Sequence, residues 1–179
     1  MAELTPEAVG EPSPFPRGPW RLLEKITVWW AIGGGLLFCA IVVMSIISIV
    51  GRKLFDTPIQ GDVELLQMGS AVAAATFLAV CEIYDHHIKV DALTTWMSEQ
   101  GRAWLDVLAH GLLMLAAAIL TWRTGLYVHE AYESQEVSSL LLIPVWWPVL
   151  LMVPSFVLLT LAALARLLVS LRIARGGEK

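Results

Sequence analysis

Histidine and acidic side chains near the middle of the chain raise the question of a metal or haem site. His86, His87 and His110 stand close to acidic residues, among them Glu82. Two histidines hold haem in a membrane bundle when they face each other from neighbouring helices at matched depth. Here His110 lies inside an apolar segment, whereas His86 and His87 follow the end of another. No CxxCH motif occurs. The pattern favours a wet, hydrogen-bonded cluster at a membrane boundary and no cofactor, with a haem-binding four-helix redox subunit as the alternative.

A second group of polar residues could form an ion pair at the opposite boundary. Arg52 ends the first apolar segment, Glu64 begins the second, and Gln67 shares the helix face of Glu64 at i+3. A lone charge near hydrocarbon is costly, so we expect Arg52 and Glu64 to pair. Such a pair either only orients two helices or also contacts a partner subunit.

Motifs for enzyme chemistry are absent from the sequence. It contains no Ser-His-Asp pattern, no phosphate-binding glycine loop and no HExxH. The central parts of the apolar segments also lack the acids and histidines that a proton relay or an ion-coupled carrier needs. We therefore expect neither an enzyme nor a self-contained pump. The two cysteines, Cys39 and Cys81, fall at different depths and are not expected to form a disulfide.

Long apolar segments dominate the 179 residues, which are 57% hydrophobic with a mean hydropathy of +0.68. Some 20 apolar residues in a helix cross a hydrocarbon core of about 30 Å. The candidate spans are residues 26–50, 63–83, 104–128 and 143–168. The sequence predicts an all-α membrane protein with a disordered tail at residues 1–19, a four-helix membrane domain at residues 20–171 and a second tail at residues 172–179.

The basic residues predict the orientation of these spans. Nine of the twelve Lys and Arg residues fall on the two termini and the second loop, and cytoplasmic segments carry such an excess. Both termini should therefore be cytoplasmic. No basic stripe is dense enough to bind nucleic acid.

Small residues crowd the second apolar segment, Gly69 and Ala73 among them. Small side chains allow close approach of helix backbones in lipid. We therefore expect this helix inside the bundle or against a partner subunit.

Several of these residues also resemble the pattern of a known family, the small membrane subunit (DctQ type) of tripartite ATP-independent periplasmic (TRAP) transporters. The resemblance covers residues 20–171. In the family an Arg closes the first helix, an aromatic and a Pro follow, a Glu-Leu pair opens the second helix, and His-Ile-x-Val-Asp comes after it. The corresponding residues are Arg52, Phe55, Pro58, Glu64, Leu65, His87, Ile88, Val90 and Asp91. The entry to the fourth helix is similar at Ser139, Ile143, Pro144 and Trp146. Gln60-Gly61-Asp62 stands where the family often has a Trp.

The resemblance implies a role that the residues alone do not supply. The small subunit of this family is a scaffold in the bacterial inner membrane that braces a large membrane subunit (DctM type). The large subunit carries the substrate and sodium sites, and a periplasmic binding protein delivers an organic acid anion. Under this reading the candidates for structural or partner contacts are Arg52, Glu64, Gln67, Gly69, Ala73, His87, Asp91 and Pro144. A membrane assembly protein without transport is the other alternative.

Overall fold

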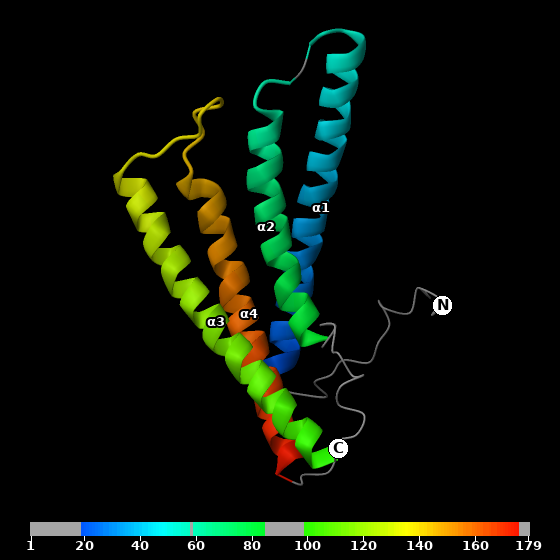
Figure 1. Cartoon of the computed structure of the whole chain (residues 1–179), viewed down its shortest axis with the longest axis vertical. Helices are drawn as coiled ribbons and strands as arrows, with labels where there is room; N and C mark the ends of the chain where they lie inside the picture. Colours follow the sequence, from blue (N-terminus) through cyan, green and yellow to red (C-terminus); the bar gives the residue numbers. More distant parts are fainter. Residues whose placement is uncertain (1–18, 58, 85–98, 176–179) are drawn as a thin grey trace.

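The computed structural model describes residues 19–57, 59–84 and 99–175. These residues form four long helices, α1 (Pro19–Leu54), α2 (Asp62–Ile83), α3 (Glu99–Glu133) and α4 (Trp146–Ala174) (Figure 1). Each is long and apolar enough to cross a membrane. The expected all-helical fold with four candidate spans is confirmed. The helices α1 and α3 extend beyond the predicted spans because the polar flanks also continue as helix.

The four helices lie side by side in the order α1, α2, α4, α3 (Figure 1). The helix α1 packs on α2, α2 on α4, and α4 on α3, with a smaller contact between α1 and α4. In the described helices, no Cα atoms of α2 and α3 approach within 8 Å of each other. The arrangement is therefore a layer of two helix pairs, α1–α2 and α3–α4, joined where α2 meets α4.

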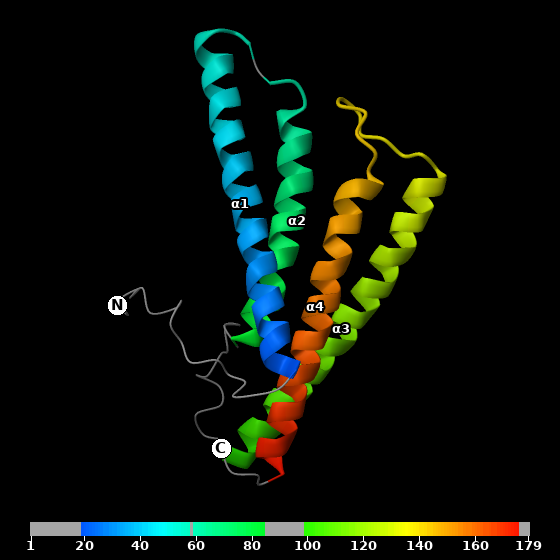
Figure 2. The ribbon, with the colours of Figure 1, turned by 180° about the vertical axis from the view of Figure 1, so that it is seen from behind.

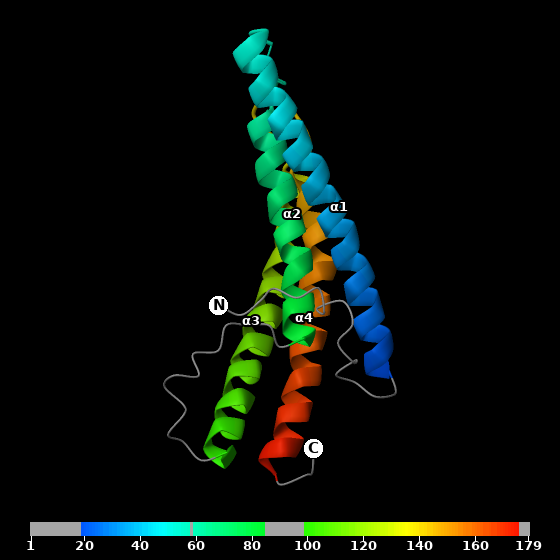
Figure 3. The same cartoon turned by 90° about the vertical axis from the view of Figure 1, so that its right-hand side faces the viewer.

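The two pairs diverge toward one end of the molecule. We call this the loop end, since it holds the α1–α2 turn and the loop between α3 and α4 (Figures 1 and 2). The opposite end is the terminal end, where α1 begins and α4 finishes. Figure 3, turned by 90°, shows α1 and α2 overlapping at the loop end. Contact between the pairs is thus closest toward the terminal end.

Glycines allow α1 and α2 to pack closely. A Cβ added to Gly34 of α1 would collide with the side chain of Thr76, and one added to Gly69 of α2 would collide with Ile41. The hydroxyl of Thr76 donates to the carbonyl of Ala73 at 2.7 Å, so its polarity is satisfied within its own helix. This is the close approach of backbones that small residues permit in lipid.

Small and aromatic side chains fill the contact between α2 and the other pair. One cluster of buried residues combines Ala75, Ala79, Ala117, Phe156 and Leu159. A second, toward the terminal end, combines Ile83, Ala162 and Ala165. The α2–α4 seam, which we define by these two clusters, is the only extensive packing that joins the two helix pairs within the described residues.

A hydrogen bond links α1 to α4 beside this seam. The indole Nε1–H of Trp30 donates to Ser155 Oγ at 2.9 Å. Ser155 is completely buried, so the bond satisfies a hydroxyl that has no access to water. Pro154 precedes it inside α4.

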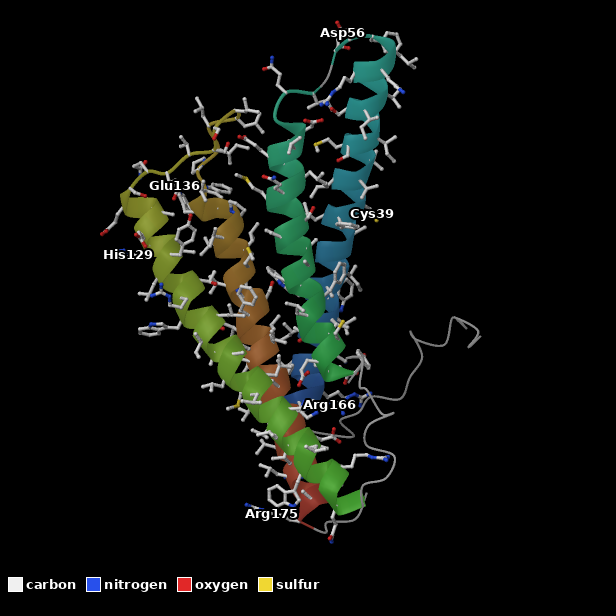
Figure 4. The ribbon with its side chains drawn as sticks, viewed as in Figure 1. Cys39, Asp56, His129, Glu136, Arg166 and Arg175 are labelled. Atoms are coloured by element: carbon white, nitrogen blue, oxygen red, sulfur yellow. The ribbon has the colours of Figure 1, made fainter. Side chains whose placement is uncertain are left out.

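Outward surfaces of the layer are strongly apolar. Trp29 and Trp122 are 74% and 70% exposed, and Leu, Ile and Val side chains line the free faces of α1 and α3. Cys39 also points outward from α1 (Figure 4), and both cysteines are free, as expected. Such surfaces are stable only against lipid or another membrane protein.

Candidate functional site

Glu64 lies in the first turn of α2, and its carboxylate binds the loop that connects α3 to α4. Its Oε1 accepts a hydrogen bond from the backbone N–H of Leu140 at 2.8 Å, and its Oε2 accepts one from Leu141 at 3.1 Å. Hydrogen bonds to an ionised acceptor are about twice as strong as neutral ones. We call this interaction the loop contact. It joins the two helix pairs at the end where their helices diverge.

The loop itself is held in a defined shape by backbone pairing. The N–H of Ser138 donates to the carbonyl of Ile143 at 2.9 Å, and the N–H of Val145 donates to that of Glu136 at 3.0 Å. Figure 4 labels Glu136 at the start of this loop. Leu142 adopts a positive φ of 53°, which is uncommon for a bulky residue. The pairing presents the two N–H groups that Glu64 binds.

Pro144 belongs to this loop. It forms an isolated antiparallel bridge with Val137, and α4 begins only at Trp146. The predicted start of the fourth span at Ile143 is therefore too early. Pro144 cannot donate a backbone hydrogen bond, which suits a position whose carbonyl alone is used, here by the N–H of Trp147 at 3.3 Å.

Gly61 supports the loop contact from the preceding turn of the chain. It is buried and has a φ of 75°, the left-handed region that glycine adopts without steric cost. A Cβ at this position would also collide with the side chain of Leu141. Gly61 is thus the surface on which the α3–α4 loop rests.

The predicted pair between Arg52 and Glu64 is wrong. Arg52 Nη2 instead donates to Asp62 Oδ2 at 3.1 Å, and the same oxygen accepts from the Ser48 hydroxyl at 2.6 Å. Two residues apart on a helix means about 200° around its axis. Asp62 therefore faces α1, whereas Glu64 faces the α3–α4 loop. The helix geometry therefore brings Asp62, and not Glu64, within reach of Arg52.

Other candidates on α2 have different surroundings. Gln67 is exposed, and its side chain forms no hydrogen bond with the described residues. Gly69 packs against Ile41 of α1, and Ala73 is completely buried. Gly69 and Ala73 therefore serve packing within the chain, and Gln67 is open to an environment outside it. His87 and Asp91 lie outside the described residues.

A buried pair that the sequence did not reveal joins α2 to α3. Glu82 Oε1 lies 2.7 Å from His110 Nδ1. The Glu82 side chain is 0% exposed and that of His110 is 7% exposed. The expectation of a wet cluster is wrong for these two residues. Glu82 occupies the α2 face that also carries Ala75 and Ala79, at i+7 and i+3, so it points into the seam.

Helices α1 and α4 also contribute polar groups near the buried pair. The Nε–H of Arg166 on α4 donates to the backbone carbonyl of Glu82 at 3.3 Å. Figure 4 labels Arg166 in the terminal half of the molecule. The hydroxyl of Tyr84 donates to Glu24 of α1 at 3.0 Å, and Glu24 is only 8% exposed. All four helices therefore meet in polar contacts at the terminal end.

Comparison with known proteins places this architecture in a family. A family model described as "Tripartite ATP-independent periplasmic transporters, DctQ component" matches residues 41–173. The match runs from the middle of α1 to the end of α4 and covers most of the chain. The chain belongs to the DctQ family. No curated protein and no solved structure matches it.

Membership in the DctQ family makes the chain a component of a transport system and not an enzyme. Both the loop contact and the buried pair lie inside the matched region. The indole of Trp30, which bonds to Ser155, lies before it. The residues that join the two helix pairs are thus mostly part of the region that the family shares.

The two described histidines of this DctQ component do not form a haem site with each other, and His86 and His87 lie outside the described residues. His110 already binds Glu82 through Nδ1, and His129 lies near the loop end of α3, 3.7 Å from Glu133 (Figure 4). These two histidines lie far apart along one helix and cannot face each other across a cofactor. Within the described part of the chain, no three His, Cys, Asp or Glu side chains gather as metal ligands.

Proposed function

We propose that this chain is the small scaffold subunit of a sodium-coupled TRAP transporter that takes up an organic acid anion. It braces the large membrane subunit, which carries the substrate and sodium sites, while a periplasmic binding protein delivers the substrate. Family membership is the observation that carries the proposal.

The cavities of the chain support a bracing role. Three cavities along the described helices measure about 460, 360 and 160 Å³, and their lining is almost entirely apolar. Thr121 and Thr160 line the largest, yet their hydroxyls already donate to the carbonyls four residues earlier, each at 2.8 Å. An organic anion needs cationic or N–H groups to replace its hydration. None of these three cavities offers a Lys, Arg or His side chain.

The apolar surface of the layer supports the partnership with a large membrane subunit. In the most apolar window of each span, between 11% and 33% of residues are buried inside the chain. The least buried are the outer helices α3 and α1, at 11% and 17%. A layer of helices leaves two broad faces for lipid and for a larger membrane protein.

Reconstitution tests the division of labour. Proteoliposomes with the large subunit and this chain, supplied with binding protein, a sodium gradient and a panel of organic acids, should accumulate substrate. Vesicles with this chain alone should not, because a brace without a transport site moves nothing. Vesicles with the large subunit alone should not either, because that subunit lacks its brace. Substantial uptake by this chain alone would overturn the proposal. A Soret band in the purified chain would favour the redox alternative instead.

We also propose that both termini are cytoplasmic, which places the loop end in the periplasm of a bacterial inner membrane. The excess of Lys and Arg at the terminal end supports this orientation. Fluorescent protein fused to either terminus should fluoresce, and alkaline phosphatase fused there should be inactive. An active C-terminal phosphatase fusion would contradict the orientation.

A further inference from the structure

The contact between α2 and α3 rests on few residues. Their backbones stay apart. One buried cluster holds Ala75 and Ala79 of α2 and Ala117 of α3 together with Phe156 and Leu159 of α4, and Glu82 contacts His110 directly. Methyl groups pack without a preferred direction, so an alanine patch tolerates a small slide of one helix along the other. A hydrogen bond of 2.7 Å between two side chains does not tolerate it.

We propose that Glu82 and His110 are positioning residues that fix the register of the α3–α4 pair against α2. The proposal concerns the chain by itself and is independent of the proposed transport role. Fixing the register of neighbouring helices is the best-attested role of buried polar groups. A misaligned arrangement separates the two partners, and this raises its free energy.

The neighbours of His110 on α3 strengthen the selection of one register. Asp106 and Met114 lie one turn to either side of His110 on the same helix face. A slide of α3 by one turn would bring one of them opposite Glu82. The carboxylate of Asp106 would repel that of Glu82, and the thioether of Met114 has no N–H to donate. Both one-turn slips are therefore penalised at the same position.

The surroundings of Glu82 make this selection effective. Its side chain has no exposure, so water cannot replace a lost partner. Arg166 of α4 donates to the backbone carbonyl of Glu82, so α4 also contacts this position. Since the two helix pairs meet here and diverge toward the loop end, the register at this point also sets their separation further along (Figures 1 and 2).

Distances between two spin labels test the register directly. The labels replace Val63 of α2 and Leu126 of α3, which are 53% and 47% exposed, in the full chain with Cys39 and Cys81 changed to Ala. The chain is studied in lipid nanodiscs. The unaltered pair should give one narrow distance distribution. Glu82→Ala or His110→Ala should broaden it or add a second population, since a one-turn slip displaces a helix by about 5.4 Å.

Two further variants make the result decisive. The exchange Glu82→His with His110→Glu restores a donor and an acceptor and should recover the narrow distribution. His129→Ala is the matched control, because it removes an exposed histidine that also lies beside a glutamate of α3. It should leave the distances unchanged. An unaltered narrow distribution in Glu82→Ala would overturn the proposal. Where the alanine variants do not accumulate, recovery of both yield and distance by the exchange supports it, and failure of the exchange contradicts it.

Discussion

The two ends of α2 bind the other helix pair by different means. At the loop end, the Glu64 carboxylate binds backbone N–H groups of an accessible loop. At the terminal end, the Glu82 carboxylate binds the side chain of His110 with almost no exposure. Water can replace the first interaction when it breaks but has no access to the second. The same residue type therefore contributes differently at the two ends, and its environment decides how much.

Loss of the buried carboxylate should have the largest effect. Glu82→Ala removes the carboxylate that lies 2.7 Å from the buried His110 Nδ1, and breaking a buried pair from one side costs about 3–5 kcal/mol. We expect the free energy of unfolding in mixed micelles to fall by a large part of that amount. Chemical denaturation followed by circular dichroism measures it. A loss below about 1 kcal/mol would contradict the contrast between the two ends. Glu82→Gln keeps an acceptor oxygen and should lower the free energy of unfolding by less than Glu82→Ala.

Gly61→Ala should disturb the loop end without removing its carboxylate. A non-glycine residue at this positive φ costs on the order of 1–3 kcal/mol, and the new methyl group would displace Leu141. We expect a smaller loss of stability than in Glu82→Ala, measured by the same denaturation. Gly33→Ala is the control, because a Cβ there meets nothing within 4 Å. Equal losses in the two glycine variants would show that the loop does not rest on Gly61.

Glu64→Ala should loosen the loop while the helices stay folded. The amides of Leu140 and Leu141 lose their acceptor, so their hydrogen exchange should approach that of an open loop, while the amides of the α2–α4 seam stay protected. Mass spectrometry of exchanged peptides resolves the two regions. If the loop meets the large subunit, the yield of the two-subunit complex should fall as well. Gln67→Ala, one turn along α2, should leave the hydrogen exchange of the loop unchanged, since Gln67 does not bind the loop amides.

The smallest effect belongs to the accessible ion pair. A double-mutant cycle of Arg52→Ala and Asp62→Ala should show weak coupling, because exposed pairs contribute little. The cycle of Arg52→Ala and Glu64→Ala should be additive, since those two side chains have different partners. Strong coupling in the second cycle and none in the first would show that Arg52 pairs with Glu64 and not with Asp62. Denaturation midpoints of the three single and two double variants, together with the unaltered chain, supply both cycles.

The apolar pattern of the sequence predicted the fold but did not predict most of the pairs that the polar side chains form. Some 20 uncharged residues can satisfy their backbone in lipid only as helix, so the four spans follow from composition. The partner of Arg52 depends on which side of α2 faces α1, and a choice between acids two residues apart requires the helix phase. Gly61 and Asp62 carried that information, because a glycine just before the helix sets where its first turn begins.

The buried pair was harder to foresee for another reason. Glu82 and His110 are 28 residues apart in the chain and come from helices whose backbones do not pack on each other. Both helices pack on α4, which brings the two side chains together, and no single segment of the sequence shows that arrangement. Alanines at i−3 and i−7 from Glu82 were a usable signal, since they mark the helix face that a neighbour approaches.

The order of the helices has a consequence for how the chain is made. The helix α2 leaves the ribosome well before α4, so the α2–α4 seam cannot form until the last helix has entered the bilayer. Each pair of antiparallel neighbours can insert by itself, and the seam then closes between two segments already in the membrane. Separately expressed halves, one ending after α2 and the other beginning before α3, should therefore assemble into the native chain fold. The biosynthetic order and the spatial order differ at one place, and that place is where the molecule is joined.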